Sequence, residues 1–352
     1  MNSLSQSKNS FEFENRKFLD LYEPYKDKYF LEKKKLAKGF KVSWDFWNDL
    51  EEFMEAGKKL RGFLVYLGYL ATGGKDIKKI LPVSLSYEVA HSFLLMHDDV
   101  IDRSDVRRGK PTIHKKYAGD HGDHFGQSIA IVWGDIAAFE SMALVCEADF
   151  ENNLKLKALN YFIGTIISTG LGEGIDVVNS YLTPKESDIK AVNILKTAKY
   201  SVVGPLVCGG ILAGARESQI KAMESFGLAA GEAFQLQDDL LGIFGEENVV
   251  GKSVLSDMRE GKSTFLMLKT KNLASKIDKK TISKVWGNNI ATLSDLKKIR
   301  QIVKSSGAYE GSLRAMTKLE KKALSEIKSA KFSDHVNGIF SDMTKFLISR
   351  GF

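Results

Sequence analysis

The chain has 352 residues, of which 43% are hydrophobic and 27% are charged. This composition is typical of a globular protein with a large buried core and not of a disordered chain. The formal net charge of +7 suits an anionic substrate, an anionic membrane or nucleic acid, and charge alone does not choose among them.

The sequence has no recognisable targeting or membrane segment. Residues 1–16 are polar and of mixed charge, unlike a signal peptide, and we expect no apolar run long enough to span a bilayer. The two cysteines, Cys146 and Cys208, have apolar neighbours and no metal-ligand spacing, which predicts buried, reduced thiols. These features predict a cytoplasmic protein with at most peripheral membrane contact.

Apolar residues recur at helical spacing along most of the chain. We expect a flexible tail at residues 1–15 and a single all-helical domain at residues 16–352. Predicted helices cover residues 18–38, 47–56, 63–70, 81–102, 128–144, 161–178 and 226–244. Another helix begins near Pro184, and Thr292 resembles an N-cap. Because no segment alternates like a strand, we predict an all-α fold of about ten or more helices around a central cavity.

Glycines inside two of the predicted helices indicate close packing. Gly134 marks a point where a neighbouring helix approaches. Gly170, Gly172 and Gly174 alternate, but no strand pattern surrounds them as it would in a dinucleotide site. They predict a kink or a close contact between helices.

The stretch LLMHDDVIDRSDVRRGKPTIH, residues 94–114, carries a strong chemical signal. Asp98 and Asp102 lie one turn apart at the end of an apolar helix, with Asp99 about a quarter-turn round. Such carboxylates repel one another unless a cation lies among them, and hard oxygen ligands that leave room for water and phosphate suit Mg²⁺. An isolated DDxxD is more often a solvated helix end, so the interpretation depends on the residues that follow.

Those residues form a loop marked by glycine and proline that carries Arg107 and Arg108. A guanidinium group binds two phosphate oxygens at once and stays charged when it is desolvated. An arginine pair beside three carboxylates therefore predicts a joint site for a metal and a diphosphate.

A second acidic cluster ends another apolar helix. Asp238 and Asp239 lie late in the segment 226–244, and Gln235 precedes Asp239 by one turn. A loop bounded by glycines and two more lysines, Lys252 and Lys262, follow this helix. Two carboxylate clusters, each followed by cations, predict two walls of one pocket.

Several other residues fit an anionic ligand in the same pocket: Lys58, Arg61, His91, Lys196 and Thr197. Lys58 and Arg61 share a helix face, and a histidine facing a phosphate can donate a hydrogen bond. On local sequence alone, each is as readily an ordinary surface or core residue. The nearby acidic clusters favour phosphate contacts, because an anion is needed to bring acids and cations together.

These motifs, in this order, resemble those of trans-isoprenyl diphosphate synthases, the family that contains farnesyl and geranylgeranyl diphosphate synthases. The resemblance runs from about residue 34 to residue 350. Its matching pieces are GKxxR at 57–61, HDDVIDRSDVRRGKPTIH at 97–114, GD at 134–135, KT at 196–197, FQLQDD at 234–239 and GKSVLSDMREGKST at 251–264. The family implies an all-helical homodimer that uses three Mg²⁺ to condense isopentenyl diphosphate with an allylic diphosphate.

The resemblance also implies a role for each matching residue. The metals would be held by Asp98, Asp99, Asp102, Asp238 and Asp239. The allylic diphosphate would be contacted by Arg107, Lys196 and Lys252, with Lys262 near it. Isopentenyl diphosphate would be held by Lys58, Arg61, His91 and Arg108. The developing allylic cation would be flanked by Thr197 and Gln235.

Two residues depart from the family pattern. Gly242 stands in place of the last aspartate of the second motif, so that Asp238 and Asp239 would serve there without it. Glu173 stands where many members have glutamine.

The length of the product in this family depends on residues just before the first acidic motif. Phe93 is an aromatic residue five positions before Asp98, whereas Leu94, four before, is not aromatic. This resembles the pattern for a C20 geranylgeranyl product and implies that Phe93 and Leu94 form the pocket floor. An ideal helical wheel by itself places Leu94 below Asp98. Farnesyl and longer-chain products are the alternatives.

Three other functions share part of these features. A class I terpene cyclase has the first acidic motif but does not need cations such as Lys58, Arg61 and Arg108 for a second substrate. A noncatalytic subunit of the same fold would carry lesions in its acids, and Gly242 is the one candidate. A nucleic-acid binder would explain the +7 charge but not the ordered acids, so we expect no nucleic-acid partner.

Overall fold

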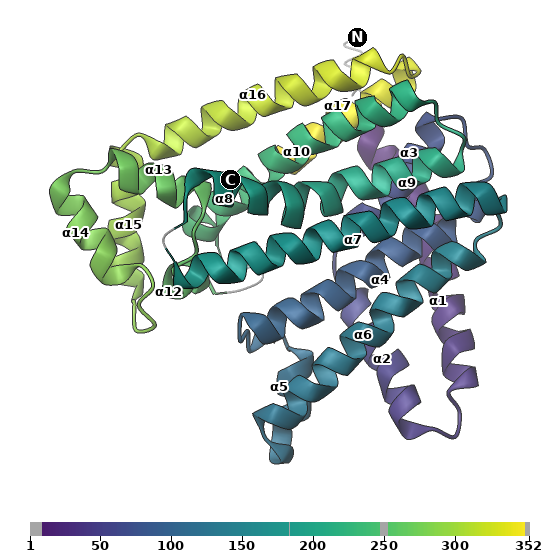
Figure 1. Ribbon diagram of the computed structural model, residues 1–352, viewed down its shortest axis with the longest axis horizontal. Coiled ribbons are helices and arrows are strands. Elements are labelled where there is room, and N and C mark those ends of the chain that lie inside the picture. Colours follow the sequence, from purple (N-terminus) through teal and green to yellow (C-terminus); the bar gives the residue numbers. More distant parts are fainter. Residues whose placement is uncertain (1–8, 183, 247–252, 349–352) are drawn as a thin grey trace, which may run out of the picture. The chain divides into compact units, whose positions relative to one another are not determined.

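In a computed structural model, residues 9–182, 184–246 and 253–348 are described, and most of them are helical. The chain divides into two compact units (Figure 1). The first comprises Met1–Ile163, Pro205–Ile220 and Phe332–Ile339, and the second comprises Gly164–Gly204, Lys221–Lys331 and Phe340–Phe352. Residues of both units occur in the long helices α7 (Asn152–Tyr181), α10 (Glu217–Phe244) and α17 (Asp334–Ile348). The prediction of an all-α fold is confirmed, and the extent of the domain stays a prediction.

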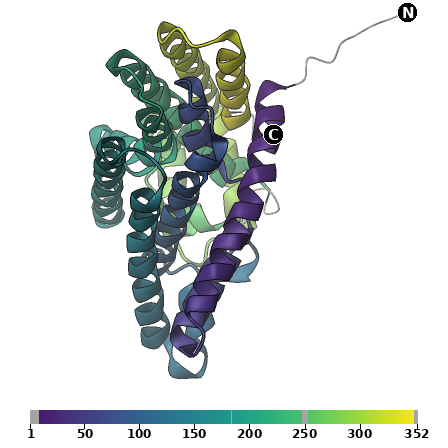
Figure 2. The ribbon, with the colours of Figure 1, turned by 90° about the vertical axis from the view of Figure 1, so that its right-hand side faces the viewer.

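The first unit is built on α4, which packs between α3 and α6 and also against α1. In Figure 2 the purple helix α1 runs along the side of this unit. The unit consists of α1 (Ser10–Leu36), α2 (Lys41–Glu55), α3 (Leu60–Ala71), α4 (Ile77–Ile101), β1 (Val106–Arg107), β2 (Lys110–Pro111), α5 (Ile113–Ala118), the 3₁₀ helix η1 (Gly119–His121), α6 (Asp123–Glu147) and most of α9 (Gly204–Leu212).

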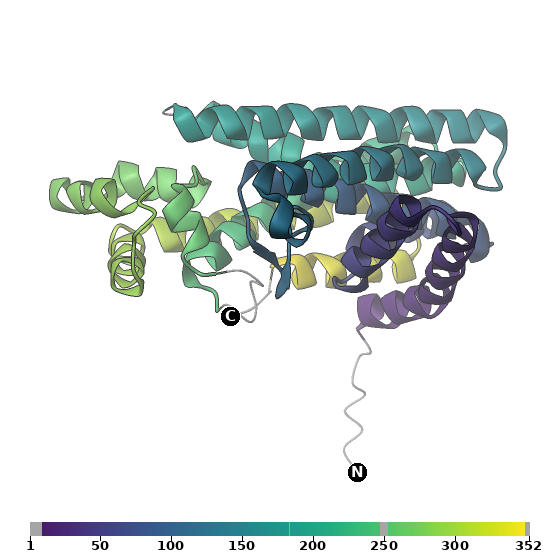
Figure 3. The same ribbon diagram turned by 90° about the horizontal axis from the view of Figure 1, so that it is seen from below.

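A short antiparallel hairpin joins α4 to α5 (Figure 3). Val106 pairs with Pro111, and Arg107 pairs with Lys110. The expectation that the chain has no strand is therefore wrong at this one place among the described residues. Two residues a side are too few for an alternating pattern to be visible in a sequence.

The first helix begins earlier than the sequence indicated. The Asn9 side chain accepts hydrogen bonds from the backbone N–H groups of Phe11 and Glu12, at 3.1 and 3.2 Å, so α1 starts at Ser10. Phe11 is buried, and its ring meets Phe63 of α3 edge to face at 5.2 Å. The tail expected at residues 1–15 is thus wrong from residue 10 onward, and residues 1–8 lie outside the described ranges.

The glycine expected to mark close packing in α6 does so. A Cβ on Gly134 would lie 2.1 Å from Nε2 of His97, which donates a hydrogen bond to the Ile131 carbonyl at 3.1 Å. A larger residue at 134 would displace the His97 ring, which lies next to the first acidic motif at the end of α4.

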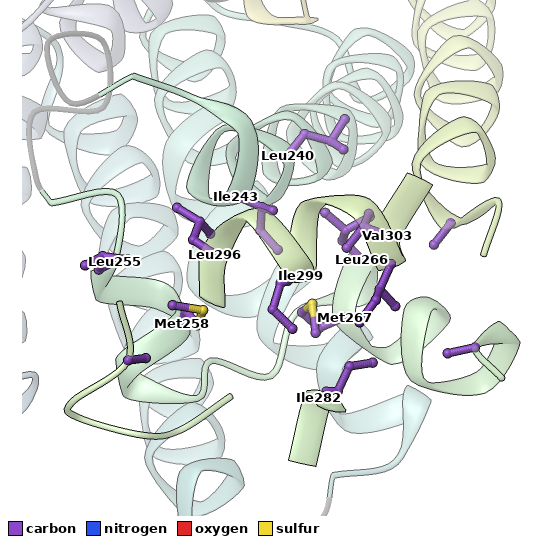
Figure 4. Packing of buried hydrophobic residues seen from close by; sticks show 14 of the residues in the cluster. Leu240, Ile243, Leu255, Met258, Leu266, Met267, Ile282, Leu296, Ile299 and Val303 are labelled. Carbon is purple, nitrogen blue, oxygen red and sulfur yellow. The ribbon is translucent and has the colours of Figure 1, made fainter. Parts of the chain in front are cut away.

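The second unit has an apolar core where α10 meets the helices that follow it. Its elements are α8 (Glu186–Val192), the π-helix η2 (Asn193–Val203), most of α10, α12 (Ser256–Glu260), α13 (Phe265–Leu273), α14 (Lys276–Val285), α15 (Leu293–Ser305) and α16 (Ala308–Ser329). The core contains Leu240, Ile243, Leu255, Met258, Leu296 and Ile299 (Figure 4). The expected N-cap at Thr292 is confirmed, because its hydroxyl accepts a hydrogen bond from Asp295 N at 3.4 Å.

Two expectations about the surface are wrong. Cys208 is buried, but Cys146 is exposed, and both are free thiols. By length and composition alone, α6 is long and apolar enough to cross a membrane. In its most apolar stretch of 18 residues, 39% is buried inside the protein. Contacts with α4 and α5 account for its buried side, so its other side presents apolar groups outward.

Candidate active site

The first acidic motif lies at the C-terminal end of α4. Asp99 is 1% exposed, Asp98 is partly buried, and Asp102, the C-cap, is exposed. Nε of Arg107 donates to Oδ1 of Asp99 at 2.7 Å, and its NH2 lies 3.4 Å from Oδ2 of Asp98. The hairpin therefore brings one predicted arginine onto two of the three predicted carboxylates.

Burial and an ion pair act in opposite directions on the pKa of Asp99. Burial raises the pKa of its carboxyl, and pairing with the Arg107 guanidinium opposes that rise. Its Oδ2 atom is buried and has no hydrogen-bond partner among the described residues. Because a buried carboxylate oxygen without a donor is costly, this atom fits a metal ion or a metal-bound water.

Arg108 points toward the C-terminal end of α2. Its NH1 donates to the carbonyl oxygens of Ala56 at 2.7 Å and Phe53 at 3.4 Å. Gly57 has a φ of +110°, and a Cβ there would lie 3.2 Å from the Arg108 guanidinium. Glycine at 57 thus allows both the turn and the approach of the arginine.

Lys59 is a structural residue beside the predicted Lys58 that the sequence analysis did not single out. It is buried, and its ammonium donates to the last carbonyl oxygens of α2, those of Met54, Glu55 and Ala56. It fixes the start of the segment in which Lys58 is exposed and Arg61 partly buried.

His91 lies among cations on α4. Burial and the charges of Arg61, Arg108 and Arg107 hold the pKa of its imidazole well below the ordinary value. The ring is therefore neutral at pH 7 and has one N–H to donate. This agrees with the predicted grouping of His91 with Arg61 and Arg108.

Lys196 lies in η2, a π-helix, which is a rare element that often occurs at functional sites. Its ammonium lies 2.6 Å from Oε2 of Glu173 and 2.9 Å from Oδ2 of Asp176, both on α7. A Cβ on Gly172 would lie 2.6 Å from the Lys196 backbone nitrogen. The middle one of the three alternating glycines therefore makes the expected close contact, whereas the other two have no described atom within 4 Å.

Thr197, Gln235 and Asp239 form a hydrogen-bonded chain. Oγ1 of Thr197 donates to Oε1 of Gln235 at 2.8 Å, and Nε2 of Gln235 donates to Oδ1 of Asp239 at 2.8 Å. η2 reaches α10 because Gly231 has no side chain: a Cβ there would lie 2.6 Å from Cα of Ala198. The predicted cation-flanking pair is thus joined to the predicted metal ligand.

The second acidic motif, like the first, has one deeply buried carboxylate. Asp239 is 4% exposed, and burial raises the pKa of its carboxyl to about 7, a rise that Gln235 and Lys262 oppose and Asp257 and Asp238 increase. Its Oδ2 atom is buried and finds no partner within the described part of the chain. A carboxylate in this state fits a site that a divalent cation completes.

The acids present fit Mg²⁺ better than a metal bound by protein alone. Within the described ranges, no three His, Cys, Asp or Glu side chains are arranged to hold a metal ion. Mg²⁺ usually takes one or two carboxylates and completes its shell with water and substrate phosphates. Asp99 in the first motif and Asp239 in the second each have one carboxylate oxygen without a partner among the described residues, and each can supply one such ligand.

Of the remaining predicted site residues, all but Lys252 lie in the described part of the chain. Phe93 is buried and Leu94 is partly buried on α4, one turn before the acids. Lys262 is partly buried. Lys252 lies outside the described residues.

Comparison with known proteins decides the family. Residues 49–303 match the family model named polyprenyl synthetase. The chain belongs to the polyprenyl synthetase family. Membership makes it a prenyltransferase, as expected from the motifs, and favours this over the terpene cyclase and nucleic-acid alternatives.

Relatives within the polyprenyl synthetases carry several product names. The chain is 32% identical over 255 residues to geranylgeranyl diphosphate synthase of Sulfolobus acidocaldarius, covering 72% of this chain and 74% of that one. It is also 32% identical over 263 residues to geranylfarnesyl diphosphate synthase of Aeropyrum pernix, covering 72% and 77%. A crystal structure of geranylgeranyl pyrophosphate synthase from Corynebacterium glutamicum, complexed with isoprenyl diphosphate and magnesium, matches with a TM-score of 0.87 and 26% identity over 97% of this chain and 99% of that one.

Proposed function

We propose that this polyprenyl synthetase catalyses the Mg²⁺-dependent 1'-4 condensation of isopentenyl diphosphate with allylic diphosphates, giving an all-trans C20 product. The observation that carries this proposal is the pairing of Arg107 with Asp98 and Asp99, beside an Asp99 oxygen that has no partner among the described residues. An anion-binding group and a cation-binding group in direct contact suit a metal-bound diphosphate.

In this proposal each acidic motif binds Mg²⁺ together with substrate diphosphate, with three Mg²⁺ in all. The ligands are Asp98, Asp99, Asp102, Asp238 and Asp239. Bound Mg²⁺ neutralises the diphosphate and so assists its departure from the allylic carbon. Arg107 and Lys196 exchange part of their carboxylate contacts for phosphate oxygens, with Lys252 and Lys262 adding positive charge.

Isopentenyl diphosphate is assigned to the cations near the start of α3. Arg108 uses two carbonyl oxygens of the α2 end as anchors, and its guanidinium has further N–H groups for phosphate. Lys58 and Arg61 lie in the segment fixed by Lys59, and neutral His91 donates one hydrogen bond. The double bond of this substrate then attacks the allylic carbon that the diphosphate has left, and the resulting cation loses a proton to the released diphosphate, which restores a double bond in the product.

The oxygens of Thr197 and Gln235 are assigned to the developing cation. Their hydrogen bonds run toward Asp239, so lone pairs of the Thr197 hydroxyl stay available to positive charge. Phe93 and Leu94 form the pocket floor, which excludes water that would otherwise quench the cation. A single aromatic residue at this level supports C20, whereas a relative named for a geranylfarnesyl product makes C25 the second candidate.

The test is a turnover assay with sized products. Purified protein is mixed with labelled isopentenyl diphosphate, dimethylallyl diphosphate and Mg²⁺, and C20 product is expected, with none after chelation of the metal. Phe93→Ala should lengthen the product, and an unchanged length would remove Phe93 as the floor. No product from any allylic primer would favour a noncatalytic subunit.

We also propose that the protein works as a homodimer through the outer face of α6. Phe125, Val132 and Phe139 are 41%, 46% and 73% exposed and recur every seven residues, with Ile136 (39% exposed) among them. Such spacing gives one apolar stripe on a helix, which a second copy of the same helix can cover. We further propose at most peripheral contact with a membrane, and we assign the protein to the cytoplasm.

A further inference from the structure

The turn between α1 and α2 presents large apolar side chains to solvent. Four of them lie within residues 36–44: Leu36 (82% exposed), Phe40 (75%), Val42 (66%) and Trp44 (45%). Figure 1 shows this turn as an open bend at the lower end of the first unit. Exposed apolar residues are normal one at a time, but a group of them marks a surface that binds a partner.

Backbone hydrogen bonds and a buried inner side hold this turn in place. Phe40 N donates to the Ala37 carbonyl at 3.1 Å, and Trp44 N donates to the Phe40 carbonyl at 3.0 Å. Gly39 makes the bend with a φ of +101°. Ala37 and Phe46 are both 3% exposed, so they occupy the inner side. The exposure of Phe40 and Trp44 is therefore a consequence of the fold.

The same turn is strongly basic. Residues 33–44 read KKKLAKGFKVSW and contain five lysines and no acid. Three of these lysines form ion pairs with acids outside this stretch: Lys33 with Glu140, Lys34 with Glu51, and Lys41 with Asp45 at 2.6 Å. Lys35 and Lys38 are exposed. Positive charge and apolar surface therefore face solvent together.

This combination selects among possible partners. Nucleic acid would attract the lysines through its phosphates, but its backbone offers Leu36 and Val42 nothing apolar to pack against. An anionic lipid bilayer offers both kinds of contact: phosphate headgroups for the ammonium groups, and the acyl boundary for leucine, phenylalanine and tryptophan. Lysine side chains keep their charge among the headgroups while their stems lie along the apolar layer.

The exposed apolar face of α6 has the opposite charge pattern. Residues 123–147 contain four acids and no lysine or arginine. Acidic groups are repelled by anionic lipid, so this face suits a second copy of the chain and not a bilayer. Charge therefore distinguishes the two apolar surfaces of the first unit.

We propose that the α1–α2 turn, residues 33–44, docks the protein reversibly on an anionic lipid bilayer. Phe40 and Trp44 enter the headgroup layer, and Lys35 and Lys38 contact lipid phosphates. The inference goes beyond the proposed function, because this surface contains none of the residues assigned to substrate or metal. A docked protein would release a long-chain product beside the phase in which its apolar tail dissolves.

The experiment measures co-sedimentation of the full chain with phosphatidylcholine vesicles, with and without phosphatidylserine. Binding is expected only with phosphatidylserine and should weaken as salt is raised. Lys35→Gln with Lys38→Gln should weaken it by about thirtyfold, because each lysine near an anionic surface contributes about fivefold. Lys321→Gln with Lys322→Gln removes the same charge from exposed positions of α16 and should leave binding unchanged.

A second set of variants tests the apolar contacts. Phe40→Ser should weaken binding by about fivefold to tenfold. The matched control is Ile290→Ser, at an 81% exposed position within residues 285–296, which contain no lysine. Tryptophan emission should shift to the blue on binding. Trp44→Phe keeps an apolar ring, so it should still bind but lose this shift. Thermal unfolding of each variant shows that it is folded.

Several outcomes would overturn this inference. One is a wild type that binds neither kind of vesicle, and another is an equal loss in the two lysine pairs or in the two serine variants. If Phe40→Ser alone turns a dimeric protein into a monomer, the turn is an interface between copies. If the Lys35 and Lys38 changes abolish binding of a DNA duplex but not of vesicles, the partner is nucleic acid. None of these measurements uses turnover, so failure of the proposed function leaves them interpretable.

Discussion

At the scale of single residues, the first motif depends on one ion pair. Asp99 is 1% exposed, and the Arg107 guanidinium is its charged partner, with NH2 2.6 Å from Oδ1. Removing one member of a buried pair leaves the other charge without compensation, which costs more free energy than the pair itself contributes.

Arg107→Met should therefore lower the free energy of unfolding by about 3 kcal/mol. Adding Asp99→Asn to that variant removes the uncompensated charge and should restore part of the loss. Urea unfolding of the two single variants and the double variant measures this coupling. Strictly additive losses would show that the two side chains do not stabilise each other.

His91 should make stability depend on pH. Its folded-state pKa lies well below the ordinary value of 6.5, so the unfolded chain takes up a proton first as the pH falls. The stability that neutral His91 contributes is present above pH 6.5 and is lost as the pH falls toward the folded-state pKa.

The measurement compares thermal unfolding of the wild type and His91→Gln from pH 7.5 to about pH 5, a range that spans the titration of histidine. The wild type should lose stability relative to the variant as the pH falls. Parallel curves would contradict a depressed pKa at His91.

The sequence predicted the residues of the local motifs better than their partners. Asp98, Asp99 and Arg107 are close in sequence, so helical spacing and one turn suffice to bring them together. A Cβ on Gly242 would lie 2.0 Å from Oδ2 of Asp257; this close approach depends on how α12 packs on α10, and no local pattern contains that information. Lys59 was missed because a buried lysine cannot be told from an exposed one without its carbonyl acceptors.

At the scale of elements, α10 and η2 pack closely because two residues of α10 at their contact are glycines. A Cβ on Gly231 would lie 2.6 Å from Cα of Ala198, and one on Gly227 would lie 3.0 Å from Cα of Val203. Backbone at this distance cannot move aside as a side-chain tip can. The hydrogen bond between Thr197 and Gln235 therefore requires glycine on this face of α10.

Gly231→Ala should lower the melting temperature and separate η2 from α10. The matched control is Gly174→Ala on α7, where no described atom lies within 4 Å of the added Cβ. That control should be neutral or stabilising by about 0.5–1 kcal/mol, because alanine favours a helix more than glycine does. Similar effects of the two variants would contradict the packing role of Gly231.

The sequence predicted most of the α-helices, but it did not predict the short hairpin or the π-helix. Long apolar stripes such as those of α4 and α10 give a strong periodic signal. The hairpin at Val106–Arg107 and the π-helix Asn193–Val203 were missed because backbone hydrogen bonds define them, and side-chain periodicity does not.

At the scale of the whole molecule, the order of motifs along the chain predicted the family. The outer face of α6 was not predicted, because an apolar helix has the same composition whether its neighbours cover it or not. Only a structure separates the side that packs on α4 and α5 from the side that carries Phe139.

This outer face should hold two copies of the protein together. Phe139→Glu places a charge in the stripe, where burying it against a second copy would cost several kcal/mol, so the variant should sediment as a monomer. The matched control is Leu36→Glu, at an 82% exposed position of α1 away from the stripe, which should leave the dimer intact. Sedimentation velocity at several concentrations measures both, with thermal unfolding as the check that each is folded. A wild type that stays monomeric, or a Phe139→Glu variant that stays dimeric, would contradict an interface on α6.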